Sequence, residues 1–361
     1  MTIALGIPTL AGRPAAVVPR PETEAGLVDS WGRVATDLRI SLTDRCNLRC
    51  TYCMPAEGLP FAPTTALMQS DEIARLAGIA VRELGVRQIR FTGGEPLLRK
   101  DLIDVVGRVA ALLPRPEISL TTNAIGLASR ARALADAGLD RINVSLDTVH
   151  AATFLEVTRR PFLERVLAGI DAAAAAGLAP IKINAVLLRG VNDDQAPELL
   201  EWCLERGHQL RLIEQMPLDA DHSWDRDTMV TAAEIRSSLS QMFRLVPTTE
   251  PRDGAPAELF DVFEGFVLRG KVGIVASVTE SFCADCRRTR LTSEGAVRSC
   301  LFSHEEVDLL GALRAGASDS ALAELWRDAM WAKPSGHGLD AGRFATDAFV
   351  QPERTMSAIG G

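Results

Sequence analysis

A unit of one short apolar strand followed by one amphipathic helix recurs along the chain between residues 37 and 213. Several of the helices are followed by glycines, which suit the left-handed backbone after a helix, at Gly85, Gly138, Gly177 and Gly207. Repetition of this unit predicts right-handed βαβ connections and a parallel sheet whose strand ends are available for chemistry. The predicted strands are 38–42, 88–91, 117–121, 141–145, 181–187 and 210–213, and the predicted helices are 70–84, 101–112, 131–137, 161–176 and 194–206.

Six such strands are too few for a closed eight-stranded barrel. We therefore expect an α/β fold with a partial (β/α)6 TIM-like barrel over residues 34–228 and one open side. Residues 229–361 combine a helix at 231–239, a Pro/Gly-rich linker at 247–256 and short alternating stretches, so they are predicted to form an α+β region that closes the open side. Residues 1–33 carry Pro14, Pro19 and Pro21, show no sustained apolar period and predict a flexible extension.

Three cysteines, Cys46, Cys50 and Cys53, follow the first predicted strand in C-x3-C-x2-C spacing. Three thiolates on one loop can hold three corners of an iron–sulfur cube and leave the fourth iron open to a small molecule. A zinc site is the first alternative, but structural zinc takes four ligands, and no histidine or fourth cysteine lies near Cys53. A disulfide framework is disfavoured, because seven cysteines in 361 residues without a signal peptide are typical of a cytoplasmic chain.

A second triad, Cys283, Cys286 and Cys300, has C-x2-C-x13-C spacing. It again lacks an evident fourth ligand, which favours a second cluster with an open iron over a zinc knuckle. Cys203 belongs to neither triad. It shares a helical face with Leu199, so we interpret it as a buried, unreactive thiol and not as a ligand.

Two further motifs point to small-molecule ligands. Residues 92–96, Thr-Gly-Gly-Glu-Pro, follow a strand, and their glycines and exposed N–H groups suit a polar or anionic group, although a Gly-Gly pair often marks only a turn. Residues 287–290, Arg-Arg-Thr-Arg, set three guanidiniums beside the second triad, which suits phosphate oxygens; the alternative is a solvated basic face. Because the net charge is −8, an anionic ligand needs such a local cluster, and general nucleic-acid binding is not expected.

The first cysteine motif, with Tyr52 before its last thiol, and the 92–96 motif one βα unit later together resemble the radical S-adenosylmethionine (SAM) enzymes. The resemblance implies a [4Fe–4S] cluster whose open iron binds the amino and carboxylate groups of SAM. It also implies that a 5′-deoxyadenosyl radical is formed, which the protein must aim and shield from water.

Further features resemble one family within that class, the GTP 3′,8-cyclases of molybdenum cofactor biosynthesis. They are the second triad, the arginine run, residues 331–338 and the terminal residues 356–361, which end in Gly-Gly. The resemblance implies a second [4Fe–4S] cluster and a lyase reaction that converts GTP to (8S)-3′,8-cyclo-7,8-dihydroguanosine 5′-triphosphate. Its implied partners are GTP, a low-potential electron donor and a downstream cyclic pyranopterin monophosphate synthase. We expect a cytoplasmic protein with a homodimer as its candidate assembly, without a membrane or nucleic-acid partner.

The family's site residues carry over onto matching positions of this chain. Those implied to contact SAM are Tyr52, Gly94, Ser145 and Met216. Those implied to contact GTP are Arg39, Arg90, Thr121, Lys182, Arg288, Thr289 and Arg290. Those implied to act in catalysis are Arg288, Arg290, Gly360 and Gly361, with the glycine tail as a mobile lid element. The implied cluster ligands are Cys46, Cys50, Cys53, Cys283, Cys286 and Cys300. Alternation in the strand at 181–187 favours an inward-pointing Lys182.

The chain departs from the family pattern at three positions. Ala124 replaces a usual glycine, Arg287 a usual asparagine and Thr289 a usual leucine. Two other functions compete with GTP cyclisation: a radical SAM maturase that modifies a peptide, and an iron–sulfur protein for redox sensing or electron transfer that does not cleave SAM. GTP binding separates the cyclase from the maturase, and formation of 5′-deoxyadenosine separates it from the redox protein.

Overall fold

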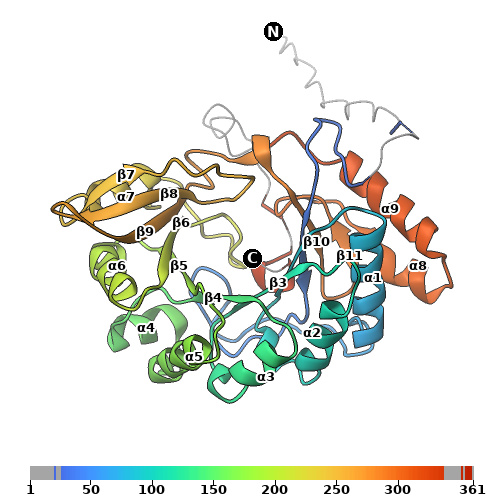
Figure 1. The fold of residues 1–361 in the computed structure, drawn as a ribbon, viewed down its shortest axis with the longest axis horizontal. Coiled ribbons are helices and arrows are strands. Elements are labelled where there is room, and N and C mark those ends of the chain that lie inside the picture. The colour runs from blue at the N-terminus through green and yellow to red at the C-terminus, as the bar shows by residue number, and fades with distance from the viewer. Residues whose placement is uncertain (1–19, 22–25, 337–350, 353, 360–361) are drawn as a thin grey trace, which may run out of the picture.

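The computed structural model describes residues 20–21, 26–336, 351–352 and 354–359, drawn as a coloured ribbon in Figure 1. The predictions made for residues 1–19, for Gly338 and for Gly360 and Gly361 lie outside these residues. No helix among the described residues combines the length and the apolar character of a membrane span.

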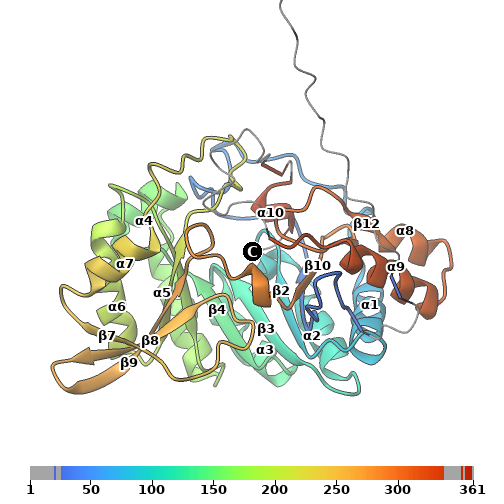
Figure 2. The same ribbon diagram turned by 90° about the horizontal axis from the view of Figure 1, so that it is seen from above.

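The described strands form one 12-stranded sheet in the order β12-β11-β10-β1-β2-β3-β4-β5-β6-β9-β8-β7. Figure 2 shows the molecule from above. The six strands predicted from the sequence are adjacent in chain order and pair in parallel. β12 and β7 are the two ends of the sheet, so the predicted partial, open barrel is confirmed. The six strands are β1 (Asp37–Ser41), β2 (Gln88–Thr92), β3 (Glu117–Thr122), β4 (Arg141–Ser145), β5 (Lys182–Leu187) and β6 (Gln209–Glu214).

Amphipathic helices cover the convex outer face of these strands (Figure 1). Helix α1 illustrates the cause: a capping box between Gln69 and Glu72 starts it, and its buried stripe includes Ile73, Leu76 and Ala80. Helix α4 (Ala151–Thr158) was not predicted from the sequence; it has no side-chain cap, and Arg159 takes the left-handed position after it that a glycine takes after several of the predicted helices. Helix α1 spans Ser70–Arg82, and the remaining outer helices are α2 (Leu102–Ala110), α3 (Ala131–Asp136), α5 (Leu163–Ala175) and α6 (Ala196–Glu205).

The C-terminal region extends the barrel sheet at both edges, which the sequence did not predict. β10 (Arg288–Leu291) pairs in parallel with β1, and β9 (Val267–Val275) pairs in parallel with β6. Antiparallel strands then complete each edge: β11 (Ala296–Arg298) and β12 (Val307–Asp308) on one side, and β8 (Glu258–Glu264) and β7 (Arg244–Pro247) on the other. Its helices are α7 (Ala232–Leu239), α8 (Leu309–Arg314), α9 (Asp319–Trp331) and α10 (Met356–Ile359).

Residues 26–33 differ from the expected flexible extension. Leu27 is completely buried, and Val28 forms a β-bridge with Val34. The Arg33 guanidinium donates to the carbonyl oxygens of Cys283, at 2.7 Å, and Pro334, at 2.6 Å. These long-range contacts leave no periodic pattern in the sequence, which explains why the segment resembles a loose arm.

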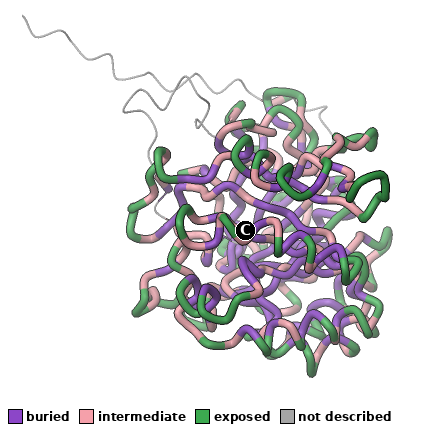
Figure 3. Tube along the Cα trace, turned by 90° about the vertical axis from the view of Figure 1, so that its left-hand side faces the viewer, coloured by how far each residue is buried: buried purple, intermediate pink, exposed green. Residues whose placement is uncertain are grey.

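The hydrophobic core lies between the sheet and its helices. Figure 3 shows the buried residues running through the middle of the molecule, with exposed residues around the rim. On β1, Leu38 and Ile40 belong to this core, whereas the alternate residue Arg39 lines a cavity on the other face of the sheet. The inner face of the partial barrel therefore carries polar and charged side chains that the outer face excludes.

The buried carboxylate of Glu214 joins three parts of the fold at the end of β6. It accepts hydrogen bonds from the backbone N–H groups of Ala232, at 2.8 Å, and Val278, at 2.7 Å. The backbone N–H of Thr279, at 2.9 Å, and the Thr279 hydroxyl also donate to this carboxylate. Because these donors are tied to one carboxylate, β6, the first turn of α7 and the segment after β9 are fixed together.

Glu214→Ala is expected to lower the free energy of unfolding by about 3 kcal/mol or more, because it strands several buried donors. The shift of the urea unfolding midpoint of the iron-free protein measures this effect. Glu57→Ala, at an exposed position, is the control and should change the free energy by less than about 0.5 kcal/mol. A Glu214→Ala change as small as the control's would show that the carboxylate does not hold these elements together.

Candidate active site

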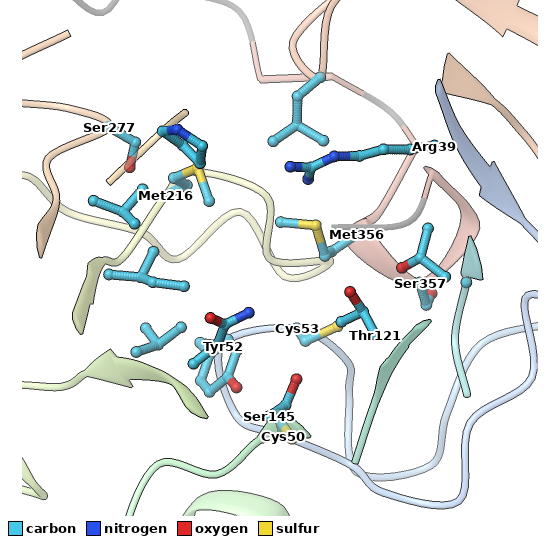
Figure 4. A pocket seen from close by; sticks show the side chains of 18 of the residues that line it. Arg39, Cys50, Tyr52, Cys53, Thr121, Ser145, Met216, Ser277, Met356 and Ser357 are labelled. Atoms are coloured by element: carbon cyan, nitrogen blue, oxygen red, sulfur yellow. The ribbon is translucent and has the colours of Figure 1, made fainter. Parts of the chain in front are cut away.

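The cavity at the carboxyl ends of the parallel strands contains both cysteine triads in its wall. The remaining wall comes from the ends of successive strands, including Thr121 from β3, Ser145 from β4 and Asn184 from β5. Figure 4 shows Cys50, Tyr52, Cys53 and Ser145 around the same cavity as Arg39 and Met216. Cys203 is completely buried in the hydrophobic core and is not part of the wall.

The loop of the first triad is held from both sides. Within it, the backbone N–H groups of Cys53 and Met54 donate to the Cys50 carbonyl, each at 3.0 Å. From outside, the Arg159 guanidinium, just after α4, donates to the carbonyls of Arg49 and Met54, each at 3.0 Å. The Tyr52 hydroxyl donates to the buried Asp147 carboxylate at 3.0 Å. These contacts give the loop a fixed shape, with the thiols facing the cavity.

The Gly-Gly motif packs against the first cysteine loop, and this changes the interpretation of its N–H groups. Gly94 N–H donates to the Thr43 carbonyl and Glu95 N–H donates to the Arg45 carbonyl, both at 2.7 Å, so neither is free for an anionic ligand. A Cβ on Gly94 would lie 2.3 Å from the Arg45 carbonyl oxygen. The glycine is therefore needed for close packing of the cysteine loop on the sheet.

The buried Glu95 side chain, which follows β2, connects that strand to the end of β3 through hydrogen bonds. Its carboxylate accepts from the Thr122 hydroxyl at 2.6 Å, the Asn123 N–H at 2.7 Å and the Leu97 N–H at 2.9 Å. Burial raises the pKa of Glu95 to about 7, and these three donors oppose that rise. The side-chain amide of Asn123 in turn lies 4.0 Å from the Cys46 sulfur. The hydrogen bonds of Glu95 therefore connect β2 and β3 with the first triad.

The first-triad thiols are in an environment that favours their neutral form. Burial raises the pKa of Cys46 to about 11 and that of Cys53 to about 12, and it also raises the pKa of Cys50 well above its usual range. Cluster ligands are thiolates, so binding of iron at this triad must release protons.

The second triad has the opposite electrostatic environment at Cys286. Burial raises the pKa of this thiol, but the positive charges of Arg288 and Lys333 outweigh it and bring the pKa to about 6. Arg288 Nε lies 3.4 Å from the Cys286 sulfur, and Lys333 Nζ lies 3.4 Å from it. Two cations thus stabilise one thiolate of this triad.

The two triads fit the iron–sulfur clusters implied by the sequence. In the part of the chain that the structure describes, all six thiols line the cavity, and no group of three His, Cys, Asp or Glu side chains is placed to hold a single metal ion. A cube places each iron at its own corner, so it requires ligands that are set apart. Each triad supplies thiolate donors of the type that such clusters take, from a partly buried loop.

A group of basic side chains forms another part of the wall. Four arginines that line the cavity are at least nine-tenths buried: Arg39, Arg90, Arg211 and Arg290. Strand register places Arg290, Arg39 and Arg90 side by side on β10, β1 and β2. The Nε atoms of Arg39 and Arg211 have no hydrogen-bond partner among the described residues.

The arginines repel one another in the absence of an anion. Burial lowers the pKa of Arg39 well below its usual range, and the charges of Arg90 and Arg290 lower it further. Burial also lowers the pKa of Arg211 to about 9, again with contributions from neighbouring arginines. A polyanion in the cavity would remove this repulsion, so the site is suited to phosphate groups.

The structure brings most of the sequence-predicted site residues together. The cavity wall includes Tyr52, Gly94, Ser145, Met216, Arg39, Arg90, Thr121, Arg288 and Arg290, together with the six triad cysteines. Lys182 and Thr289 are not in the wall. Thr289 is completely buried and accepts a hydrogen bond from Trp326 Nε1 at 2.9 Å, so its side chain faces α9.

Several wall residues have no counterpart in the sequence prediction. They include Arg211, Asn123, Asp147, Ser277, Met356 and Ser357. Arg211 had a usable signal, because it alternates with Leu210 and Leu212 on β6 as Lys182 alternates with Ile183 on β5. The α10 residues Met356 and Ser357 belong to the terminal segment that resembles the family, but no residue pattern placed these two side chains in the wall, since their position depends on a long-range return of the chain. The Ser357 backbone hydrogen-bonds to the Cys53 thiol.

The three departures from the family pattern have local explanations. Ala124 has a φ of 62°, in the left-handed region that favours glycine, and so carries backbone strain. Arg287 forms an ion pair with Asp253. Neither Arg287 nor Thr289 lines the cavity. The side chains of Arg287 and Thr289 therefore leave the wall of the site unchanged.

Comparison with known proteins places this geometry in a class. Residues 40–203 match the Radical SAM superfamily, and residues 208–339 match the family described as Molybdenum Cofactor Synthesis C. The fold is similar to that of Streptococcus suis SuiB bound to S-adenosylmethionine, with a TM-score of 0.54 and 16% identity over 89% of this chain and 76% of that one. The open parallel barrel and its three-cysteine loop thus define a radical SAM protein.

Closer relatives narrow the class to one family. A GTP 3′,8-cyclase of Paenarthrobacter nicotinovorans is 60% identical over 93% of this chain and 97% of its own length. A GTP 3′,8-cyclase of Mycolicibacterium smegmatis is 56% identical over 100% of both chains. The chain belongs to the GTP 3′,8-cyclase family.

Proposed function

We propose that this chain is a GTP 3′,8-cyclase of molybdenum cofactor biosynthesis. It converts GTP to (8S)-3′,8-cyclo-7,8-dihydroguanosine 5′-triphosphate with two [4Fe–4S] clusters and SAM. The observation that carries the proposal is that both cysteine triads and five arginines, Arg39, Arg90, Arg211, Arg288 and Arg290, line one cavity. The product is then a substrate for a cyclic pyranopterin monophosphate synthase.

The basic side chains hold the triphosphate. Arg39, Arg90 and Arg290 lie in one row across three strands, which suits several phosphate oxygens at once. Arg211 approaches from β6, where Gly273 on the neighbouring strand leaves room for its stem. Anchoring the phosphates from both sides leaves the ribose and base in one orientation, and such positioning supplies much of the rate.

The cluster loop and the strand ends orient the second small molecule. When bound, the first cluster and SAM would supply the 5′-deoxyadenosyl radical that takes the 3′ hydrogen of GTP as 5′-deoxyadenosine; C3′ would then bond to C8, and one electron from the low-potential donor and one proton would complete the product. Tyr52, Gly94, Ser145 and Met216 hold SAM beside the first triad, and the Tyr52–Asp147 hydrogen bond stiffens that wall. Met356 and Ser357 cover the first triad from α10 and limit access of water.

A turnover assay tests the proposal. Protein reconstituted anaerobically with iron and sulfide is given SAM, dithionite and GTP, and chromatography follows 5′-deoxyadenosine and the cyclised nucleotide. We expect both products, and GTP should also raise the melting temperature by relieving the repulsion among the arginines. Formation of 5′-deoxyadenosine without any response to GTP would favour a peptide maturase, and absence of 5′-deoxyadenosine would favour a redox protein.

Lys182 lies outside the cavity wall, but it is close enough to the wall residues Arg211 and Arg90 to respond to their charges, so it is expected to make GTP binding pH-dependent. Burial lowers its pKa to about 7, and the charges of Arg211, Arg141 and Arg90 contribute. Bound triphosphate favours the charged ammonium, so binding takes up a proton above pH 7. The affinity for GTP should therefore fall as pH rises from 7 to 9, by up to about tenfold per unit.

Isothermal titration of GTP across this pH range measures the slope. Lys182→Met should bind GTP more weakly at pH 7 and lose the part of the slope that Lys182 contributes. Lys100→Met, at an exposed position, should retain the wild-type profile. Equal slopes in the wild type and in Lys182→Met would show that Lys182 does not sense the triphosphate.

Three further properties belong to the same proposal. We infer a low-potential electron donor, because reductive opening of SAM needs an electron at low potential. We infer a cytoplasmic location, because free thiols that must accept iron need a reducing compartment. A homodimer is proposed as the assembly, and sedimentation of the reconstituted protein at several concentrations tests it.

A further inference from the structure

Lys333 is a buried cation that touches the second triad from outside the cavity. It follows α9, its residue is 3% exposed, and it is absent from the cavity wall. Its Nζ atom lies 3.4 Å from the Cys286 sulfur and donates to the Arg288 carbonyl at 2.8 Å. One ammonium group therefore connects a cluster ligand with the arginine two residues further along.

The N-terminal segment Asp29–Arg33, which we call the clasp, holds Lys333 in this position. Trp31 Nε1 donates to the Lys333 carbonyl at 3.1 Å. The Arg33 guanidinium donates to the carbonyls of Pro334, at 2.6 Å, and Cys283, at 2.7 Å. The Asp29 carboxylate pairs with the Nε atom of Arg33 at 2.6 Å. The clasp thus fixes the Lys333 backbone and the second cysteine loop to each other.

The environment of the ammonium indicates what it is there to meet. A buried ammonium is costly unless an anion or several acceptors compensate for its lost hydration. The charged groups that act on it most strongly are the thiols of Cys286 and Cys300 and the cations Arg288 and Arg33. Asp29 is engaged by Arg33. Among the residues that the structure describes, sulfur at the second triad is therefore the negative partner of Lys333.

We propose that Lys333, held by the clasp, is a positioning residue that donates a hydrogen bond to the Cys286 thiolate and raises the reduction potential of the second cluster. This inference concerns the second cluster and does not depend on which substrate the cavity takes. Cluster potentials respond to net charge and to hydrogen bonds on the sulfurs, and a nearby cation stabilises the more negative, reduced form. Through the Arg288 carbonyl, the same ammonium also fixes the spacing between the cluster and the arginine run.

The test measures the second cluster alone. In full-length protein with Cys46, Cys50 and Cys53 changed to alanine, only the second triad can hold a cluster, and its midpoint potential is measured by redox titration with electron paramagnetic resonance. Lys333→Met is expected to shift the midpoint to a more negative value, because charge and hydrogen bond are both lost. Lys333→Gln should shift it less, because a donor remains, and Lys333→Arg should stay nearest the unsubstituted protein.

Controls separate this role from general packing. Lys100→Met in the same background should not move the midpoint, and iron and sulfide counts establish occupancy. Lys333→Met with full occupancy and an unchanged midpoint overturns the proposal. If Lys333→Met loses the cluster, the midpoint of Lys333→Gln decides: a negative shift supports the proposal, and an unchanged midpoint overturns it. If the Met and Gln variants both lose the cluster, Trp31→Phe decides, since it removes only the hydrogen bond to the Lys333 carbonyl. A negative midpoint shift in Trp31→Phe supports the proposal, and an unchanged midpoint overturns it.

Discussion

Cys50→Ala is expected to reduce both SAM cleavage and GTP cyclisation to background. Cys50 is one of the three thiols that the first loop presents to the cavity, and two thiolates cannot hold a cube that already has one open corner. The second triad lies on a separate loop, so it should keep its cluster. Iron should therefore fall from about eight to about four atoms per chain. Anaerobic iron and sulfide analysis and chromatography of 5′-deoxyadenosine measure these changes.

The control for this substitution is Cys203→Ala. Cys203 is completely buried on α6 and belongs to neither triad, so its loss should leave iron content and SAM cleavage close to wild type. Substantial SAM cleavage by Cys50→Ala, or loss of iron in Cys203→Ala, would mean that the first cluster is not held as described.

Arg288→Ala is expected to lower GTP cyclisation by about 100-fold or more while SAM cleavage largely persists. The guanidinium lies at the cavity wall, 3.4 Å from the Cys286 sulfur and over the Phe282 ring at 4.7 Å. Removing it takes away a fixed positive charge beside the proposed substrate but touches no ligand of the first triad. The radical would then be formed and quenched without cyclisation, which the ratio of cyclised nucleotide to 5′-deoxyadenosine measures.

Arg287→Ala is the matched control, because it removes the neighbouring guanidinium. That side chain pairs with Asp253 and does not line the cavity, so coupling between SAM cleavage and cyclisation should stay intact. Arg288→Lys and an iron count distinguish loss of the substrate contact from loss of the second cluster. Normal cyclisation by Arg288→Ala would make the arginine run a solvated basic face.

The barrel was predictable because its signals are local. The strands of a parallel sheet are short apolar runs, and each helix carries its own buried stripe, so β1 to β6 and most helices can be located from residue patterns. Cysteine spacing is also local, and both triads face the cavity. The alternation of Arg39 with Leu38 and Ile40 indicated which side chains would point away from the core.

What the sequence could not predict depends on contacts between distant segments. β10 is the charged run Arg-Thr-Arg-Leu, which lacks an apolar pattern and becomes a strand because β1 offers it an edge. The clasp shows no periodicity, yet Arg33 reaches residues about 250 positions away. The Gly-Gly motif was visible, but only the structure shows that its Gly94 and Glu95 N–H groups bind the cysteine loop.

Transfer of deuterium from GTP to SAM-derived 5′-deoxyadenosine tests most directly whether the two triads serve one cavity. Reconstituted protein is incubated with SAM, dithionite and GTP deuterated at C3′, and the mass of 5′-deoxyadenosine is measured. We predict that 5′-deoxyadenosine gains one deuterium in step with formation of the cyclised nucleotide. If 5′-deoxyadenosine forms in the presence of bound GTP but carries no deuterium, SAM and GTP do not meet, and the shared cavity is not the site of the reaction.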